Sequence, residues 1–358
     1  MFNVHFHYTW LAEDEGAKSG EMLLFGLLDG IHREGSLRAA AKHIGLSYRY
    51  AWGFLARWGE QFGQPLAVLE QGRGAKLTAL GEKLLWAQQR VQARLAPQIE
   101  SLSTELEREL ATVMDAGAAR LEMSASHDLA LSLFRDYLAK HQGPRLDIRF
   151  QGSADCLAAL AANQTEIAGF HVSAQGGAEL ALFRQWLKPK TMTLIRFVTR
   201  VQGLIVAKGN PKKLRALADL ARTRARFVNR QPGSGTRLAF DRLLGEAGIE
   251  SKRIVGYEQE EFTHLAVAAT VASGHADAGI GIEAAARQYQ LDFVPLFDEQ
   301  YYFACRRELL SQARMQALLE ALRKPALRNA IRKLAGYGVD SLGEICDIDA
   351  ALPKPSKP

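Results

Sequence analysis

Cysteine is scarce in this sequence. The 358 residues include only Cys156, Cys305 and Cys346, which are far apart and never form a C-x-x-C pair. This usage indicates neither a disulfide framework nor a zinc knuckle. Stability must therefore come from hydrophobic cores, and the length and 47% hydrophobic composition suffice for two or three domains.

Long apolar runs are also missing. No segment approaches the roughly 20 apolar residues needed to cross a bilayer, and residues 1–10 show no basic region followed by an apolar core. We therefore expect a soluble, cytoplasmic protein with reduced thiols and no membrane partner.

The sequence also lacks the common catalytic and metal-binding motifs. It has no nucleophile elbow and no H-E-x-x-H, and the Gly233–Thr236 turn lacks the lysine of a Walker loop. His5 and His7 share one face of a strand expected over residues 4–11, but no third ligand accompanies them. We predict no metal site, no cofactor and no enzymatic activity.

Positive charge is present in excess and is concentrated near the N-terminus. The formal net charge is +6, and the pI is about 9.2. Between residues 33 and 94, the lysines and arginines far outnumber the acidic residues Glu34, Glu60, Glu70 and Glu82. Such a local excess indicates a nucleic-acid partner.

The same region has the pattern of a helix-turn-helix. Ser36 is a good N-cap for a helix over Leu37–His43, Gly45 suits the turn, and Ser47 is a good N-cap for a helix over Tyr48–Phe62. The positions that pack such a helix pair are apolar: Ala40, Ile44, Leu46, Ala51 and Phe54. A hairpin follows around Gly72–Lys76, which suits a wing on the DNA backbone.

The N-terminal residues of the second helix are expected to enter a major groove, where Arg49 can read a guanine edge. The predicted DNA-binding residues are Ser36, Arg38, Ser47, Tyr48, Arg49, Tyr50, Arg57, Arg73 and Lys76.

The segments Ser36–Ala41 and Gly45–Trp52, with Gly72–Gly81 behind them, resemble the winged helix-turn-helix of molybdate-responsive ModE-type regulators and, more distantly, of LysR-type regulators. The resemblance covers roughly the first 110 residues. It implies a winged helix-turn-helix domain over residues 1–80 that binds double-stranded DNA as a dimer.

A long helix is expected from Leu80 to about Val113. Apolar residues recur along it at mostly three and four positions: Leu84, Val91, Leu95, Ile99, Leu102, Leu106, Leu110 and Val113. This seam suits a partner helix, so residues 81–116 are predicted to be a linker and dimerisation helix. Packing on its own domain is the alternative. Ala116-Gly117-Ala118 is expected to be a linker.

From Leu121 onwards short apolar strands alternate with amphipathic helices, which predicts a parallel α/β sheet. The expected elements are strands at 121–123, 146–150 and 167–170 and helices at 127–141 and 154–163. A second block begins near Gly203 and ends near Val294.

Four turns in the region from Leu121 onwards place hydroxyl and N–H groups at expected helix N-termini, which suit anions. The most informative is the run from Asn229 to Arg237, which follows a short apolar strand. The predicted ligand-binding residues of the four turns are Ser124, Ser126, His127, Gly152, Ser153, Arg230, Gln231, Gly233, Ser234, Gly235, Thr236, Arg237, Thr263 and His264.

The runs Arg230–Arg237 and Val271–Gly281 resemble the periplasmic-binding-protein-like domain of cytoplasmic regulators, a relative of type II solute-binding proteins such as molybdate-binding ones. The resemblance implies a two-lobed domain over residues 117–350, with lobe I at about 117–200 and 301–350 and lobe II at about 201–300. The chain would cross between the lobes near Gly203 and near Pro295–Tyr301. Residues 351–358 are expected to form a disordered tail.

The ligand itself is open. A ModE-like DNA reader favours molybdate or tungstate, although ModE proteins usually carry a small oxyanion-binding β-barrel that is not visible here. His127, His264, Arg230 and Arg237 are more basic than an oxyanion clamp of neutral donors needs. A small carboxylate such as formate therefore remains an alternative.

We interpret the chain as a dimeric, ligand-responsive transcriptional regulator. Two other interpretations remain. An enzyme on the same two-lobed fold would need a general acid or base, for which His127 and Glu261 are the candidates. Alternatively, the C-terminal domain would only assemble oligomers.

Overall fold

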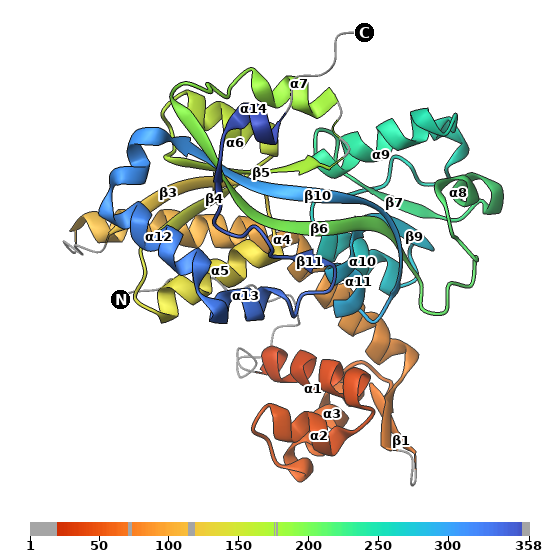
Figure 1. The fold of residues 1–358 in the computed structure, drawn as a ribbon. Helices are drawn as coiled ribbons and strands as arrows, with labels where there is room; N and C mark the ends of the chain where they lie inside the picture. The colour runs from red at the N-terminus through yellow and green to blue at the C-terminus, as the bar shows by residue number, and fades with distance from the viewer. Residues whose placement is uncertain (1–19, 71–73, 114–118, 175, 177, 353–358) are drawn as a thin grey trace. The chain divides into compact units, whose positions relative to one another are not determined.

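The computed structural model describes residues 20–70, 74–113, 119–174, 176 and 178–352 (Figure 1). The expectations for the strand at 4–11, the 116–118 linker and the end of the tail fall outside these residues. The chain divides into two compact units, which meet between Ala93 and Arg94 inside helix α4 (Ala79–Val113).

The first unit has three helices followed by a hairpin. Helices α1 (Gly20–Glu34), α2 (Leu37–His43) and α3 (Tyr48–Gln61) precede strands β1 (Ala67–Glu70) and β2 (Gly74–Leu77), which pair antiparallel. This is the order predicted for a winged helix-turn-helix. The core is lined by apolar side chains of all three helices, among them Leu24, Leu28, Ile31, Ala40, Ala51 and Leu55.

Local capping explains the turn between α2 and α3. Ser36 Oγ accepts the N–H of Ala39, and Ser47 Oγ accepts the N–H of Tyr50, so both predicted N-caps are confirmed. Gly45 has φ +74°, a backbone conformation that favours glycine.

Helix α4 is shared by the two units. Leu84 and Leu85 are buried in the core of the first unit, whereas the helix from Arg94 onwards belongs to the second. The predicted boundary at residues 80 and 81 therefore differs from the structure, because the first turns of α4 complete the N-terminal core.

The second unit is built on one mixed sheet in the order β4-β3-β5-β10-β6-β9-β7-β8. Strand β3 (Arg120–Ala125) pairs parallel with β4 (Arg145–Phe150) and β5 (Ile167–Ser173). The connecting helices are α5 (Leu129–Lys140), α6 (Ser153–Ala161) and α7 (Ala178–Arg184). In Figure 1, α6 and α7 cover one face of this part of the sheet and α5 covers the other. The predicted parallel α/β pattern is thus confirmed.

Two long antiparallel strands join the lobes. Strand β6 (Met192–Val206) pairs with β10 (Asp292–Arg306) almost along its whole length. The first-lobe half of β10 pairs with β5, and the second-lobe half of β6 pairs with β9 (Ala278–Ile282). Register shifts lie between Pro295 and Phe297 and between Gln300 and Tyr302, within the segment predicted for the second crossing.

The second lobe continues the sheet with β7 (Phe227–Arg230) parallel to β8 (Glu260–Glu261) and to β9. Its helices are α8 (Leu217–Thr223), α9 (Gly235–Glu246), α10 (His264–Ala272) and α11 (Glu283–Gln288), and a short 3₁₀ turn η2 spans Ser251–Arg253.

The C-terminal segment returns to the first lobe, as predicted. After the 3₁₀ turn η3 (Arg307–Ser311), helices α12 (Ala313–Arg323) and α13 (Pro325–Ile331) are followed by β11 (Tyr337–Gly338), β12 (Ile345–Cys346) and α14 (Ile348–Ala351). Both short strands pair with β6 on its first-lobe half. No described helix has the length and apolarity to cross a membrane.

Candidate functional site

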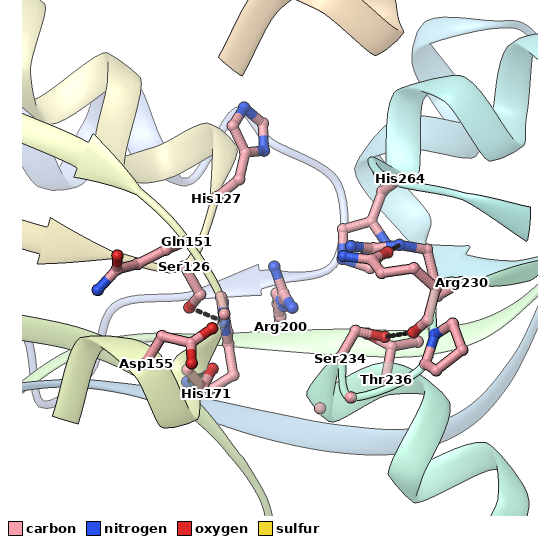
Figure 2. A pocket seen from close by; sticks show the side chains of 16 residues that line it. Ser126, His127, Gln151, Asp155, His171, Arg200, Arg230, Ser234, Thr236 and His264 are labelled. Atoms are coloured by element: carbon pink, nitrogen blue, oxygen red, sulfur yellow. Dashed lines mark hydrogen bonds between the residues drawn. The ribbon is translucent and has the colours of Figure 1, made fainter. Parts of the chain in front are cut away.

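A cleft of about 240 Å³ lies where the parallel strands of both lobes end and the following helices begin (Figure 2). One wall comes from the first lobe and the other from the second. The lining residues are Ser126, His127, Gln151, Gly152, Ser153, Asp155, His171, Arg200, Arg230, Gln231, Pro232, Gly233, Ser234, Gly235, Thr236 and His264. All four predicted turns are therefore represented in one cleft.

Three of the predicted ligand residues do not line the cleft. Ser124 is buried within strand β3 instead of following it. The guanidinium of Arg237 is held 3.1 Å from Asp241 and stacks on the Tyr257 ring. Thr263 Oγ1 accepts the N–H of Ala266 and caps α10. Arg237 and Thr263 therefore have structural roles, and Ser124 is part of the strand itself.

Glu261, one of the two candidates for a general acid or base, is also outside the lining. Its side chain is only 2% exposed. Both carboxylate oxygens accept hydrogen bonds from Arg94, and one also accepts from Thr270 Oγ1. A carboxylate held in this way is an ion-pair partner rather than a free base.

Sequence reasoning missed Asp155, His171 and Arg200 as lining residues, whereas Gln151 and Pro232 lie inside two of the predicted turns. His171 and Arg200 lie inside buried strands β5 and β6. A charged residue within an otherwise apolar strand is a usable signal, because burying an arginine requires partners.

Arg200 is the centre of a buried ionic network. It donates to Asp128 at 2.8 Å and to Glu299 at 2.7 Å, while Tyr337 donates to Asp128 and Gln202 donates to Glu299. Burial alone would lower the pKa of Arg200, but the charges of Glu299 and Asp128 raise it above its usual range. With two carboxylates in contact, this arginine is fully compensated within the protein.

His171 joins this network to the cleft. Its Nε2 lies 3.2 Å from Asp128 Oδ2, and its Nδ1 lies 2.8 Å from Ser126 Oγ. Burial, together with the charge of Arg200, lowers the pKa of His171 to about 4, so the ring is neutral. Because the carboxylate of Asp128 can only accept, Nε2 must donate to it, and the Ser126 hydroxyl must donate to Nδ1. Ser126 is therefore not the anion donor that its turn suggested.

Arg230, at the end of β7, is in a different situation. It is 7% exposed, and its guanidinium donates to the carbonyls of Glu261 at 3.1 Å and of Phe262 at 2.9 Å. Its Nη1 lies 2.9 Å from His264 Nε2. No ion pair joins it to any carboxylate of the described chain. Burial and the charge of Arg200 lower its pKa to about 9, so it still carries its charge at neutral pH.

The N-terminus of α9 lies next to Arg230 (Figure 2). Ser234 caps the helix: its hydroxyl donates to the carbonyl of Gln231 at 2.9 Å and accepts the N–H of Arg237. Gly233, at φ +79°, allows the tight turn. Among the described hydrogen bonds, none uses the N–H groups of Gly235 and Thr236, as expected for the first turn of a helix. Both residues line the cleft, so their N–H groups, rather than the Ser234 hydroxyl, are the donors available there.

The remaining histidines of the cleft are neutral. Burial lowers the pKa of His127 to about 4 and that of His264 well below its usual range, and the charges of Arg230 and Arg200 act in the same direction. The histidines therefore supply hydrogen bonds and no positive charge. The first-lobe wall also carries the carboxylate of Asp155 in the first turn of α6. Within the described residues, no cluster of His, Cys, Asp and Glu is arranged to hold a metal ion.

The predicted DNA-binding residues of the first unit lie mainly on its surface. Tyr48 and Tyr50 are 41% and 47% exposed, and Trp52 is 42% exposed beside them on α3. The other exposed predicted residues are Arg38, Ser47, Arg49, Arg57 and Lys76. Ser36 is half-buried as the cap of α2, and Arg73 lies outside the described residues.

Comparisons with known proteins show which family the second unit belongs to. A family model described as a PBP superfamily domain matches residues 135–323. The protein YvgK of Bacillus subtilis is 31% identical over 225 residues, which are 62% of this chain and 72% of YvgK. The molybdenum-pterin-binding protein MopB of Rhodobacter capsulatus is 34% identical over 106 residues, which are 28% of this chain and 39% of MopB.

Among solved structures, OxyR of Corynebacterium glutamicum is similar at 15% identity and a TM-score of 0.44, covering 87% of this chain and 92% of OxyR. The matched family has the two-lobed fold expected from the Arg230–Arg237 and Val271–Gly281 runs. Because the family model spans more than half of the 358 residues, the protein belongs to the PBP superfamily.

Proposed function

We propose that this protein is a transcriptional regulator whose first unit binds double-stranded DNA and whose cleft binds a small anion. A PBP superfamily domain with an open cleft supports the ligand-binding role. The exposed basic and aromatic residues at the start of α3 support the DNA-binding role. We further propose a homodimer, or a higher oligomer, that pairs through the apolar seam of α4 beyond Leu84, which is buried in the core of the first unit.

The observation that carries the anion proposal is the buried guanidinium of Arg230. A buried cation is costly unless a charge of opposite sign accompanies it. Arg200 contacts two carboxylates, whereas the described contacts of the Arg230 guanidinium are backbone carbonyls, the Gln231 amide oxygen and a neutral imidazole. An anion bound between Arg230 and the N–H groups of Gly235 and Thr236 would supply the missing charge and would also interact with the helix dipole.

The favoured ligand is a tetrahedral oxyanion such as molybdate or tungstate. Its support is the resemblance of the first unit to ModE-type regulators and the likeness to MopB, whose name records molybdenum-pterin binding. A small carboxylate such as formate is the second candidate, because a single guanidinium that contacts no described carboxylate and lies beside neutral histidines suits one negative charge.

The anion proposal is tested by thermal unfolding in the presence of molybdate, tungstate, sulfate, phosphate and formate, each in large excess. An anion at about 100 times its Kd would stabilise the protein by roughly 2.7 kcal/mol. Arg230→Met should abolish the shift, whereas Arg226→Met, at an exposed arginine just before the same strand, should retain it. No shift with any of these anions, or equal shifts in Arg230→Met, would contradict the proposal.

The DNA-binding proposal has its own test. Arg49→Ala should weaken binding to duplexes selected from a random pool by roughly tenfold to a hundredfold, the usual effect of losing a bidentate base contact. Arg33→Ala, on α1 and paired with Asp29, is the matched control. Turnover of any of the tested anions by the purified protein would favour an enzyme instead.

A further inference from the structure

Helix α4 contacts both lobes of the ligand-binding unit, at two places separated by Pro97. The contact with the second lobe is made by Arg94. Its Nε and Nη2 donate to the two carboxylate oxygens of Glu261 at 2.6 and 2.5 Å. This bidentate geometry is the strongest that an arginine and a carboxylate form.

The contact with the first lobe lies beyond Pro97. Ser101 Oγ accepts the N–H of Phe150 at 3.2 Å, directly before the Gln151–Gly152 wall of the cleft. Two ion pairs accompany it on the same helix, Glu100 with Arg135 and Glu107 with Arg145.

Glu261 connects the second-lobe contact to the proposed anion site. Its carboxylate is held by Arg94 and by Thr270 Oγ1, while its backbone carbonyl accepts from Arg230. The next carbonyl, that of Phe262, also accepts from Arg230. The position of the Arg230 guanidinium therefore depends on a turn whose side chain is held by α4.

Pro97 lies between the two contacts. A proline inside a helix has no N–H to donate to the preceding turn, and its ring crowds the carbonyl four residues earlier, so the helix bends most readily there. A change in the separation of the two lobes must move Glu261 relative to Phe150. Since α4 is attached to both, bending at Pro97 is the deformation that requires the least loss of hydrogen bonding.

We infer that Arg94 is a positioning residue for the proposed anion site and that α4 bridges the two lobes, so that lobe closure bends α4 at Pro97. This inference takes its ligand from the proposed function, but the contacts of Arg94 and Ser101 are present in the structure without a ligand. The same helix continues into the DNA-binding unit, since residues 79–93 belong to both α4 and that unit. Closure around a ligand would thus change the direction in which α4 leaves the lobes.

The deciding experiment is hydrogen exchange on the full-length chain without ligand or DNA. In Arg94→Ala, the hydrogen-bonded amides of the segments 230–234 and 266–267, which are those of Arg230, Ser234, Ala266 and Val267, should exchange on the order of tenfold faster, because the turn beneath Arg230 loses its ion pair. Arg94→Lys should restore much of the protection. Arg108 lies on the same helix and forms an exposed ion pair with Glu122 of β3. Arg108→Ala removes this ion pair and should change exchange in neither segment.

Faster exchange confined to α4 in Arg94→Ala, or no rescue by Arg94→Lys, would overturn the inference. A second measurement uses sodium molybdate and calorimetry. The inference expects roughly tenfold weaker binding in Arg94→Ala and unchanged binding in Arg108→Ala. Failure of wild-type protein to bind molybdate counts against the proposed ligand alone, because the exchange result decides the role of Arg94 independently.

Discussion

The two walls of the cleft are made from the same kind of local structure but differ in charge. On the first-lobe wall, α5 is capped by Asp128, and α6 carries Asp155 in its first turn. On the second-lobe wall, α9 is capped by the neutral Ser234, and the adjacent Arg230 contacts no carboxylate among the described residues. Helix N-termini that look equivalent in sequence are therefore not equivalent anion sites, because a carboxylate already occupies some of them.

The two arginines of the cleft offer the strongest test of this contrast. Arg200→Met should destabilise the protein by about 3–5 kcal/mol, since Asp128 and Glu299 would be left buried without their counter-ion. Arg230→Met leaves no carboxylate unpaired and should change the stability of the ligand-free protein far less. Urea unfolding of both variants checks this. Equal losses would mean that Arg230 has a compensating charge within the protein.

Acid should affect the first-lobe wall through His171. Its pKa is about 4 in the folded state, and the ordinary value is 6.5. The unfolded chain therefore binds the proton first, and the stability that comes from the neutral ring is complete above pH 6.5 and is lost as the pH falls toward 4. Between pH 7 and pH 5, this one group should cost about 2 kcal/mol.

Urea unfolding at the two pH values measures the loss, and His171→Gln serves as the control. Its amide can still donate to Asp128 but does not titrate, so the variant should lose that part of the pH dependence. An identical pH dependence in wild type and variant would show that His171 does not contribute to the pH dependence of stability.

The smallest effect is expected from Asp155, because its carboxylate is exposed and screened by solvent. Asp155→Asn removes a negative charge from the cleft and should tighten anion binding about twofold to fivefold, which is the usual scale for an exposed charge. Asp136→Asn, on an exposed part of α5 outside the lining, is the matched control. Weaker binding in Asp155→Asn would instead show that the ligand donates a hydrogen bond to this carboxylate.

Much of this architecture could be predicted because it depends on local patterns. Neighbouring residues determine the caps Ser36 and Ser47, the glycine of the turn and the alternation of strands and helices. Residues of all four predicted polar turns also line one cleft.

What could not be predicted depends on contacts between distant residues. The Arg200 network brings together side chains from positions 128, 200, 299 and 337, and no short window of sequence contains two of them. Likewise, the Ser126 hydroxyl is occupied by a hydrogen bond to His171, which is 45 positions away in the sequence. The roles of individual donors in the cleft required the three-dimensional structure.

The paired strands β6 and β10 have a consequence for the rate of motion between the lobes. They link the lobes as a two-stranded ribbon, and the irregularities at Pro295/Phe297 and Gln300/Tyr302 lie within it. At such bulges the ladder is already interrupted, so the ribbon can flex there without breaking further hydrogen bonds. We therefore expect the lobes to open and close about this connection on the order of microseconds to milliseconds, as for other hinge motions.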